Sequence, residues 1–136
     1  MTYLVDTSVW AGFFRERGTS ANRQLDALIV ADPRQVLGCP PVRMELSVDP
    51  NELRRRRLLR TYDGFQSTDI LADDFDLAAD IYRAAQRSGH TIRSQLDCVI
   101  AAIAVRAEAV LVHRDIGYER MAECVSDLAV LRLPDS

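Results

Sequence analysis

Four acidic residues stand at points of the chain where a carboxylate could take part in catalysis. They are Asp6, Glu45, Asp97 and Asp115. Asp6 ends the apolar run 3–5, and Asp115 follows the apolar run 110–113. Ligand sites of open parallel sheets lie at the carboxyl ends of the strands. An aspartate after a strand is also a common helix cap or turn former, so each of these two alone fits either interpretation.

Asp97 lies in the segment 96–105, whose other residues are all apolar. This pattern predicts a buried helix, where an unpaired ionised carboxylate would cost several kcal/mol. Arg93, four residues earlier, could pair with it, and a bound metal ion is the other solution; both remain open at this point. Glu45 stands near the start of a predicted short helix, where an exposed side chain favoured by the helix dipole is the simple alternative.

The types of charged residue limit the chemistry. All seventeen basic residues are arginine, which excludes Schiff-base chemistry and P-loop phosphate binding, because both need a lysine. The absence of lysine also argues against phosphoacceptor and phosphatase domains whose mechanism uses one. Carboxylate oxygens suit Mg²⁺ or Mn²⁺, which can activate water and stabilise the leaving oxygen in phosphodiester hydrolysis. The formal net charge is −3, but it becomes +1 once the four acids are set aside, so a polyanionic substrate is not excluded.

The elements that must position these acids alternate along the chain. Short apolar runs predict strands at 3–5, 35–39, 65–70, 110–113 and 128–133, with helical patterns between them. This alternation predicts an α/β fold with a parallel sheet covered on both faces. Three aspartates crowd the start of the long helix after the third strand, and we expect them to complement its dipole: Asp73, Asp74 and Asp76.

Length and composition indicate one globular domain over residues 1–136. The uncharged stretches are too short to cross a bilayer, and no secretory signal precedes Asp6, which predicts a cytoplasmic protein without a membrane partner. Three cysteines without C-x-x-C spacing indicate reduced thiols.

Four short motifs together resemble those of PIN-domain nucleases, and the size is most similar to the VapC-type toxins of bacterial toxin–antitoxin pairs. The motifs are Asp6-Thr7-Ser8, Glu45-Leu46, Asp97-x-x-Ile100-Ala101-Ala102, and Asp115 followed by Tyr118. The resemblance implies a PIN-like three-layer α/β/α domain with a short, mostly parallel sheet. It also implies an Mg²⁺-dependent ribonuclease, with Mn²⁺ as a substitute, whose acidic site consists of the four acids. Thr7 or Ser8 would support Asp6, and a homodimer and a small VapB-type antitoxin are further implications.

The chain departs from its relatives near the last acid. His113 stands where they commonly carry Thr or Ser, and Tyr118 where they commonly carry Phe. His113 is either a proton donor or ligand, or a structural histidine bonded to the backbone. Arg93 and Arg114 flank the predicted acids and could hold RNA phosphate or fix the carboxylates.

Two further interpretations remain open. The run Arg54–Arg57 predicts a solvated helix, with salt-dependent attraction to RNA as the functional alternative. For the whole chain, a catalytically silent PIN-like domain that only binds RNA or protein is the alternative to a nuclease, and it would lack metal-dependent turnover.

Overall fold

The computed structural model describes residues 1–15 and 18–134. Within these residues the chain forms five strands, seven α-helices and one short 3-10 turn. In chain order they are β1 (Tyr3–Val5), α1 (Thr7–Arg15), α2 (Ser20–Ala31), the turn Pro33–Gln35, β2 (Val36–Gly38), α3 (Pro40–Ser47), α4 (Glu52–Tyr62), β3 (Gln66–Ser67), α5 (Ala72–Arg87), α6 (Gln95–Arg106), β4 (Val110–His113), α7 (Ile116–Cys124) and β5 (Val130–Arg132).

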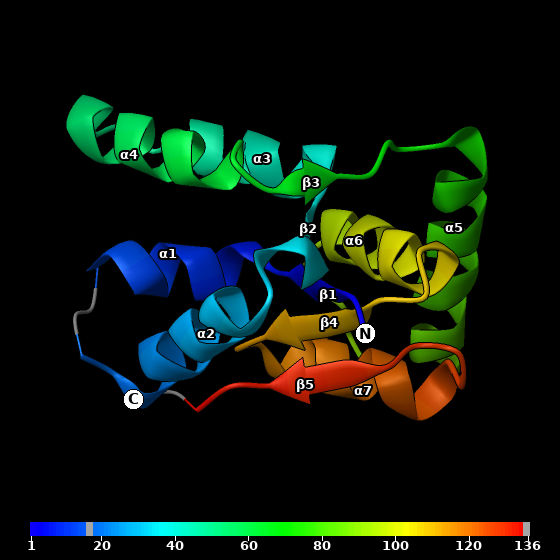
Figure 1. Ribbon diagram of the computed structural model, residues 1–136. Helices are drawn as coiled ribbons and strands as arrows, with labels where there is room; N and C mark the ends of the chain where they lie inside the picture. The colour runs from blue at the N-terminus through cyan, green and yellow to red at the C-terminus, as the bar shows by residue number, and fades with distance from the viewer. Residues whose placement is uncertain (16–17, 135–136) are drawn as a thin grey trace.

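The five strands form one sheet in the order β3-β2-β1-β4-β5, and every neighbouring pair is parallel. Leu4 of the central strand β1 lies opposite Leu37 on one side and Leu111 on the other. The carboxyl ends of the strands therefore lie at the same edge of the sheet, and the arrows of β4 and β5 point the same way in Figure 1. The predicted α/β/α fold is confirmed, and the sheet is parallel throughout.

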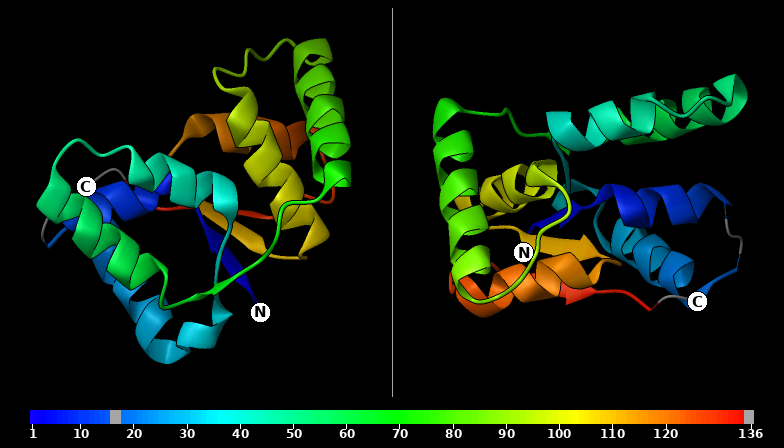
Figure 2. Two further views of the ribbon diagram at one scale, coloured as in Figure 1. Left: turned by 90° about the horizontal axis from the view of Figure 1, so that it is seen from above. Right: turned by 180° about the vertical axis from the view of Figure 1, so that it is seen from behind.

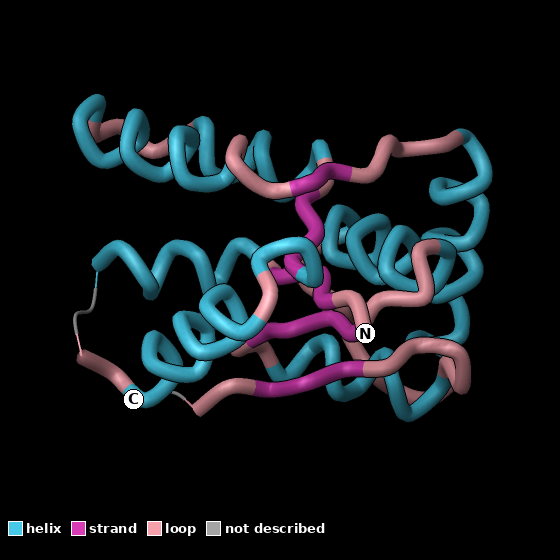
Figure 3. The backbone as a smooth tube through the Cα atoms, viewed as in Figure 1, coloured by secondary structure: helices cyan, strands magenta, loops and turns pink. Residues whose placement is uncertain are grey.

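Helices form the outer layers of the molecule. Helices α5, α6 and α7 gather on one side of the sheet, and α1 and α2 lie on the other (Figure 2). Helices α3 and α4 lie beyond β2 and β3, at the edge of the sheet (Figure 1). The strands are short and central, with helix around them (Figure 3). Among the described residues, none of the helices is long and apolar enough to cross a membrane.

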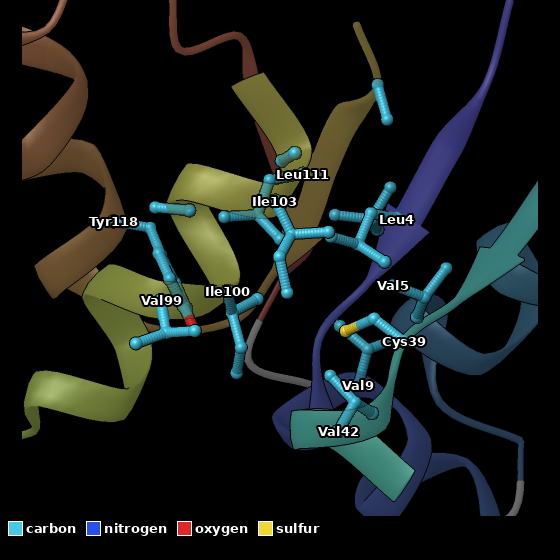
Figure 4. Packing of buried hydrophobic residues seen from close by; sticks show 14 of the residues in the cluster. Leu4, Val5, Val9, Cys39, Val42, Val99, Ile100, Ile103, Leu111 and Tyr118 are labelled. Carbon is cyan, nitrogen blue, oxygen red and sulfur yellow. The ribbon is translucent and has the colours of Figure 1, made fainter. Parts of the chain in front are cut away.

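The core joins the sheet to helix α6. Leu4, Leu111, Ile100 and Ile103 are fully buried and lie together in Figure 4. All seven residues 98–104 of α6 are buried, as the apolar pattern predicted. Packing on every side fixes the position of this helix, and with it the Asp97 in its first turn.

Side chains at the starts of two helices have further partners. Asp74 lies in the first turn of α5, as expected, and its side chain is 1% exposed. It accepts hydrogen bonds from the backbone N–H of Leu71 and from the Arg106 guanidinium, which ties the start of α5 to the end of α6. At the start of helix α2, the Thr19 hydroxyl accepts the Asn22 N–H and caps the helix.

Candidate acidic site

Asp6 follows β1 directly and is 5% exposed. Its backbone N–H donates to the carbonyl of Val112 at 2.9 Å, which extends the pairing of β1 with β4. The Oδ2 atom of Asp6 accepts the Ser8 hydroxyl at 2.7 Å and the Ser8 backbone N–H at 3.1 Å. Ser8 thus holds the Asp6 carboxylate in one orientation, in the supporting role that the resemblance implied for Thr7 or Ser8.

Asp97 faces Asp6 across the hydroxyl of Tyr118. The Tyr118 Oη atom lies 2.8 Å from Asp6 Oδ1 and 3.2 Å from Asp97 Oδ1. Burial, followed by the charge of Asp6, raises the pKa of Asp97 from 3.8 to about 7, while the Tyr118 hydroxyl opposes this rise. Sequence reasoning gave Tyr118 no role in the site. The signal it offered was a tyrosine where relatives commonly carry phenylalanine.

Glu45 belongs to the same site and does not form part of an exposed helix face. The Thr7 hydroxyl donates to Glu45 Oε1 at 2.7 Å, so Thr7 orients Glu45 while Ser8 orients Asp6. Burial raises the pKa of Glu45, the Thr7 hydrogen bond lowers it, and the charge of Asp6 raises it again. Burial is thus the main cause of the raised pKa of Glu45, and the charge of Asp6 adds to it.

Asp115 lies at the rim of this group. It is exposed and caps helix α7, with its Oδ1 atom accepting the Gly117 N–H at 2.9 Å. Its charge still contributes to the raised pKa of Asp97. The structure therefore brings Asp6, Glu45 and Asp97 together at the sheet edge and places Asp115 beside them, where it also stabilises a helix.

His113 is the structural histidine of the two alternatives. It is fully buried, and its Nδ1 atom accepts the Asp115 backbone N–H at 3.0 Å. Its Nε2 atom lies 3.1 Å from Glu119 Oε1, and burial lowers the pKa of the ring. With both ring nitrogens bonded, His113 fixes the turn that presents Asp115 and has no nitrogen left for a proton transfer or a metal.

The two flanking arginines differ. Arg93 is exposed and, within the described part of the chain, makes no hydrogen bond or ion pair, so the alternative of an Arg93–Asp97 pair is not formed. Arg114 donates its backbone N–H to the Ser8 hydroxyl at 3.3 Å. Its guanidinium lies against Gly12 of α1, where a Cβ atom would collide with it.

The arginine run on α4 is a solvated helix face with local partners. Arg54 forms a bidentate pair with the buried Asp49, including a 2.8 Å contact from its Nη2 atom. Arg56 pairs with Glu52 one turn earlier. These contacts support the structural interpretation of the run.

The donor chemistry of the site fits a divalent cation. Among the described residues, no three Asp, Glu, His or Cys side chains are arranged as a group that could hold a metal ion. Mg²⁺ needs only one or two carboxylates, because it retains several waters and also binds substrate phosphate. Asp6 and Asp97, whose oxygens lie on either side of one hydroxyl, supply that number of hard oxygen ligands.

The structure combines a parallel α/β sheet with carboxylates at its carboxyl edge, of which Asp6 is buried and Asp97 half-buried. The sequence profile of the PIN domain matches residues 3–123. The chain therefore belongs to the PIN-domain family, as its motifs predicted.

Within this family, individual proteins are similar to the chain over most of its length. The chain is 39% identical over 123 residues to VapC ribonuclease Mb1587 from Mycobacterium bovis and to ribonuclease VapC11 from Mycobacterium tuberculosis, covering 88% of this chain and 90% of each relative. Among solved structures, VapBC2 from Rickettsia felis, bound to a promoter DNA fragment, gives a TM-score of 0.76 at 16% identity, covering 98% of this chain and 100% of that chain. FitAcB from Neisseria gonorrhoeae gives 0.71 at 21% identity, covering 96% and 97%. These structures share the fold.

Proposed function

We propose that this protein is a metal-dependent endoribonuclease that hydrolyses RNA phosphodiester bonds and acts as the toxin of a toxin–antitoxin pair. The observation that carries the proposal is the pairing of Asp6 and Asp97 across the Tyr118 hydroxyl, at the carboxyl edge of a PIN-domain sheet. The names of the 39% identical relatives, VapC ribonucleases, support the same activity.

Asp6 and Asp97 would hold Mg²⁺, or Mn²⁺ in its place. Glu45 and Asp115 would complete the acidic site around the ion. A bound ion would supply an activated water and stabilise the charge on the leaving oxygen. Ser8 orients the Asp6 carboxylate, and Thr7 orients Glu45.

Arg93 and Arg114 are the proposed contacts to RNA phosphate. Arg93 is exposed four residues before Asp97, and a guanidinium can bind phosphate oxygens bidentately. Unstacked nucleotides in single-stranded loops are the expected target, because their backbone can bend into a compact site.

We also propose a small VapB-type antitoxin as partner, a homodimer as the assembly, and the cytoplasm as the location. The VapBC assemblies among the structures of the same fold support the antitoxin. Co-expression with a candidate VapB-type antitoxin, followed by co-purification and measurement of mass in solution, tests the antitoxin and the homodimer together.

The decisive experiment is cleavage of a mixed cellular RNA pool by the purified protein with Mg²⁺, with Mn²⁺ and with chelator. We expect metal-dependent cuts at a few discrete sites that disappear in Asp6→Asn. Asp26→Asn, which changes an exposed acid on α2, is the matched control and should cleave like the wild type. No cleavage by a folded wild-type protein that binds metal would favour the silent binding domain.

A further inference from the structure

Tyr118 carries a hydroxyl that packing alone does not require. Its side chain is 1% exposed, lies beside α6 (Figure 4), and stacks at a tilt against the ring of His113, with centroids 5.2 Å apart. A phenylalanine would fill the same space. A buried hydroxyl costs free energy unless it is hydrogen-bonded. Within the described residues, its hydrogen bonds go to Asp6 and Asp97 alone.

The hydrogen bonds of Asp6 show which oxygen remains available. A carboxylate offers about four acceptor positions, two on each oxygen. Ser8 fills both positions on Oδ2, through its hydroxyl and its backbone N–H. Tyr118 fills one position on Oδ1. Asp6 therefore keeps one open acceptor position, on the oxygen that Tyr118 contacts.

We propose that Tyr118 is a positioning residue for cation binding, whose hydroxyl holds Asp6 Oδ1 and Asp97 Oδ1 facing each other. The proposal rests on the function proposed above and adds a role for this residue. Outer groups that orient ligand oxygens in this way typically change metal affinity by about 10- to 100-fold.

The test compares Tyr118→Phe with Tyr62→Phe by measuring Mn²⁺ affinity through electron paramagnetic resonance. Tyr62 is the matched control, because it is also buried but its hydroxyl bonds to the backbone of Cys39 and touches no carboxylate. We expect Mn²⁺ to bind at least about tenfold more weakly to Tyr118→Phe and with unchanged affinity to Tyr62→Phe. At saturating Mn²⁺, RNA cleavage by Tyr118→Phe should recover, since the hydroxyl acts through the acids and not on RNA.

Equal or tighter Mn²⁺ binding by folded Tyr118→Phe overturns the proposal. If that variant does not fold, the wild-type protein still gives an answer, because cation binding beside the phenol should shift its near-ultraviolet absorption. An unchanged tyrosine spectrum at saturating Mg²⁺ would also overturn it. Failure of the proposed ribonuclease function has a different signature: the wild type binds Mn²⁺ but cleaves no RNA, while the affinity difference between variants remains.

Discussion

At the scale of single residues, Asp97 and Glu45 occupy positions where ionisation is unfavourable, because the pKa of each is raised. Asp97 is half-buried and repelled by Asp6, Glu45 and Asp115. Perturbed carboxyl groups of this kind gather at functional sites, because the same arrangement that destabilises the free protein attracts a cation. Stability and function are therefore expected to oppose each other at Asp97.

We predict that Asp97→Asn abolishes metal-dependent cleavage but stabilises the metal-free protein at alkaline pH. The folded chain holds the Asp97 proton up to about pH 7, whereas the unfolded chain releases it near its ordinary 3.8. The free energy of unfolding of the wild type must then fall as pH rises through this window. With an allowance for partial solvent exposure, Asp97→Asn should be more stable by about 1–2 kcal/mol at pH 8.

Urea denaturation in chelator at pH 5 and pH 8 measures this difference. Asp26→Asn, which changes an exposed acid on α2, should retain the pH dependence of the wild type. An Asp97→Asn variant with that same dependence would contradict the assignment of the raised pKa.

Thr7 offers a second prediction at the same scale. Thr7→Val removes the hydrogen bond that lowers the pKa of Glu45, so that pKa should rise further. The acidic limb of the pH–activity profile should move to higher pH, with a larger loss of cleavage at pH 6 than at pH 8. Thr7→Ser keeps the hydroxyl and should restore the wild-type profile. A uniform loss at both pH values would show that Thr7 acts through packing.

At the scale of elements, the sequence predicted which strands and helices form, but not which side chains link elements that lie far apart along the chain. The apolar runs of β1, β4 and α6 predicted buried elements, and the structure buries each of them. The Asp74–Arg106 pair was not predictable, because it joins residues 32 positions apart. The Tyr118 contact with Asp6 was hidden for the same reason, with 112 positions between the partners.

Two substitutions of Asp115 separate the effect of its helix cap from the effect of its negative charge. Asp115→Ala should lower the free energy of unfolding by about 1 kcal/mol, because the cap on the Gly117 N–H is lost. Asp115→Asn retains a side-chain oxygen and should keep wild-type stability. Both should cleave RNA more slowly, since each removes the negative charge beside Asp97. Equal stability of the two variants in thermal melts would show that the cap contributes nothing.

The Asp74–Arg106 pair links α5 to α6 and should be a main determinant of stability on that side of the sheet. Asp74→Ala removes the carboxylate partner of the Arg106 guanidinium, which among the described residues keeps only its hydrogen bond to the Asp69 carbonyl, and opens the α5 cap, so the expected loss is about 3 kcal/mol. Asp73→Ala, one residue earlier and exposed, should change stability little. Chemical denaturation checks both, and similar values for the two variants would refute the structural role.

At the scale of the whole molecule, part of the basic charge is already paired with acidic side chains. The chain has 17 arginines against 20 acids, and several arginines already have partners in ion pairs, among them Arg43, Arg54 and Arg106. The sequence alone could not say which arginines were engaged, because most of these partners lie on other elements. Attraction of RNA to an acidic edge must come from the arginines that the fold leaves exposed beside it.

Arg93 is the exposed arginine whose position predicts a measurable salt effect. It lies four residues before Asp97 and, among the residues described, has no ion pair. Arg93→Ala should lower kcat/KM for RNA about tenfold at low salt. It should also reduce the slope of log kcat/KM against log salt concentration by about 0.7, the value for one phosphate contact on a single strand. Arg56→Ala, which removes a charge already paired with Glu52, is the matched control and should leave the slope unchanged. If kcat/KM and its salt dependence fall equally in both variants, RNA responds to the net charge of the protein and Arg93 makes no contact of its own.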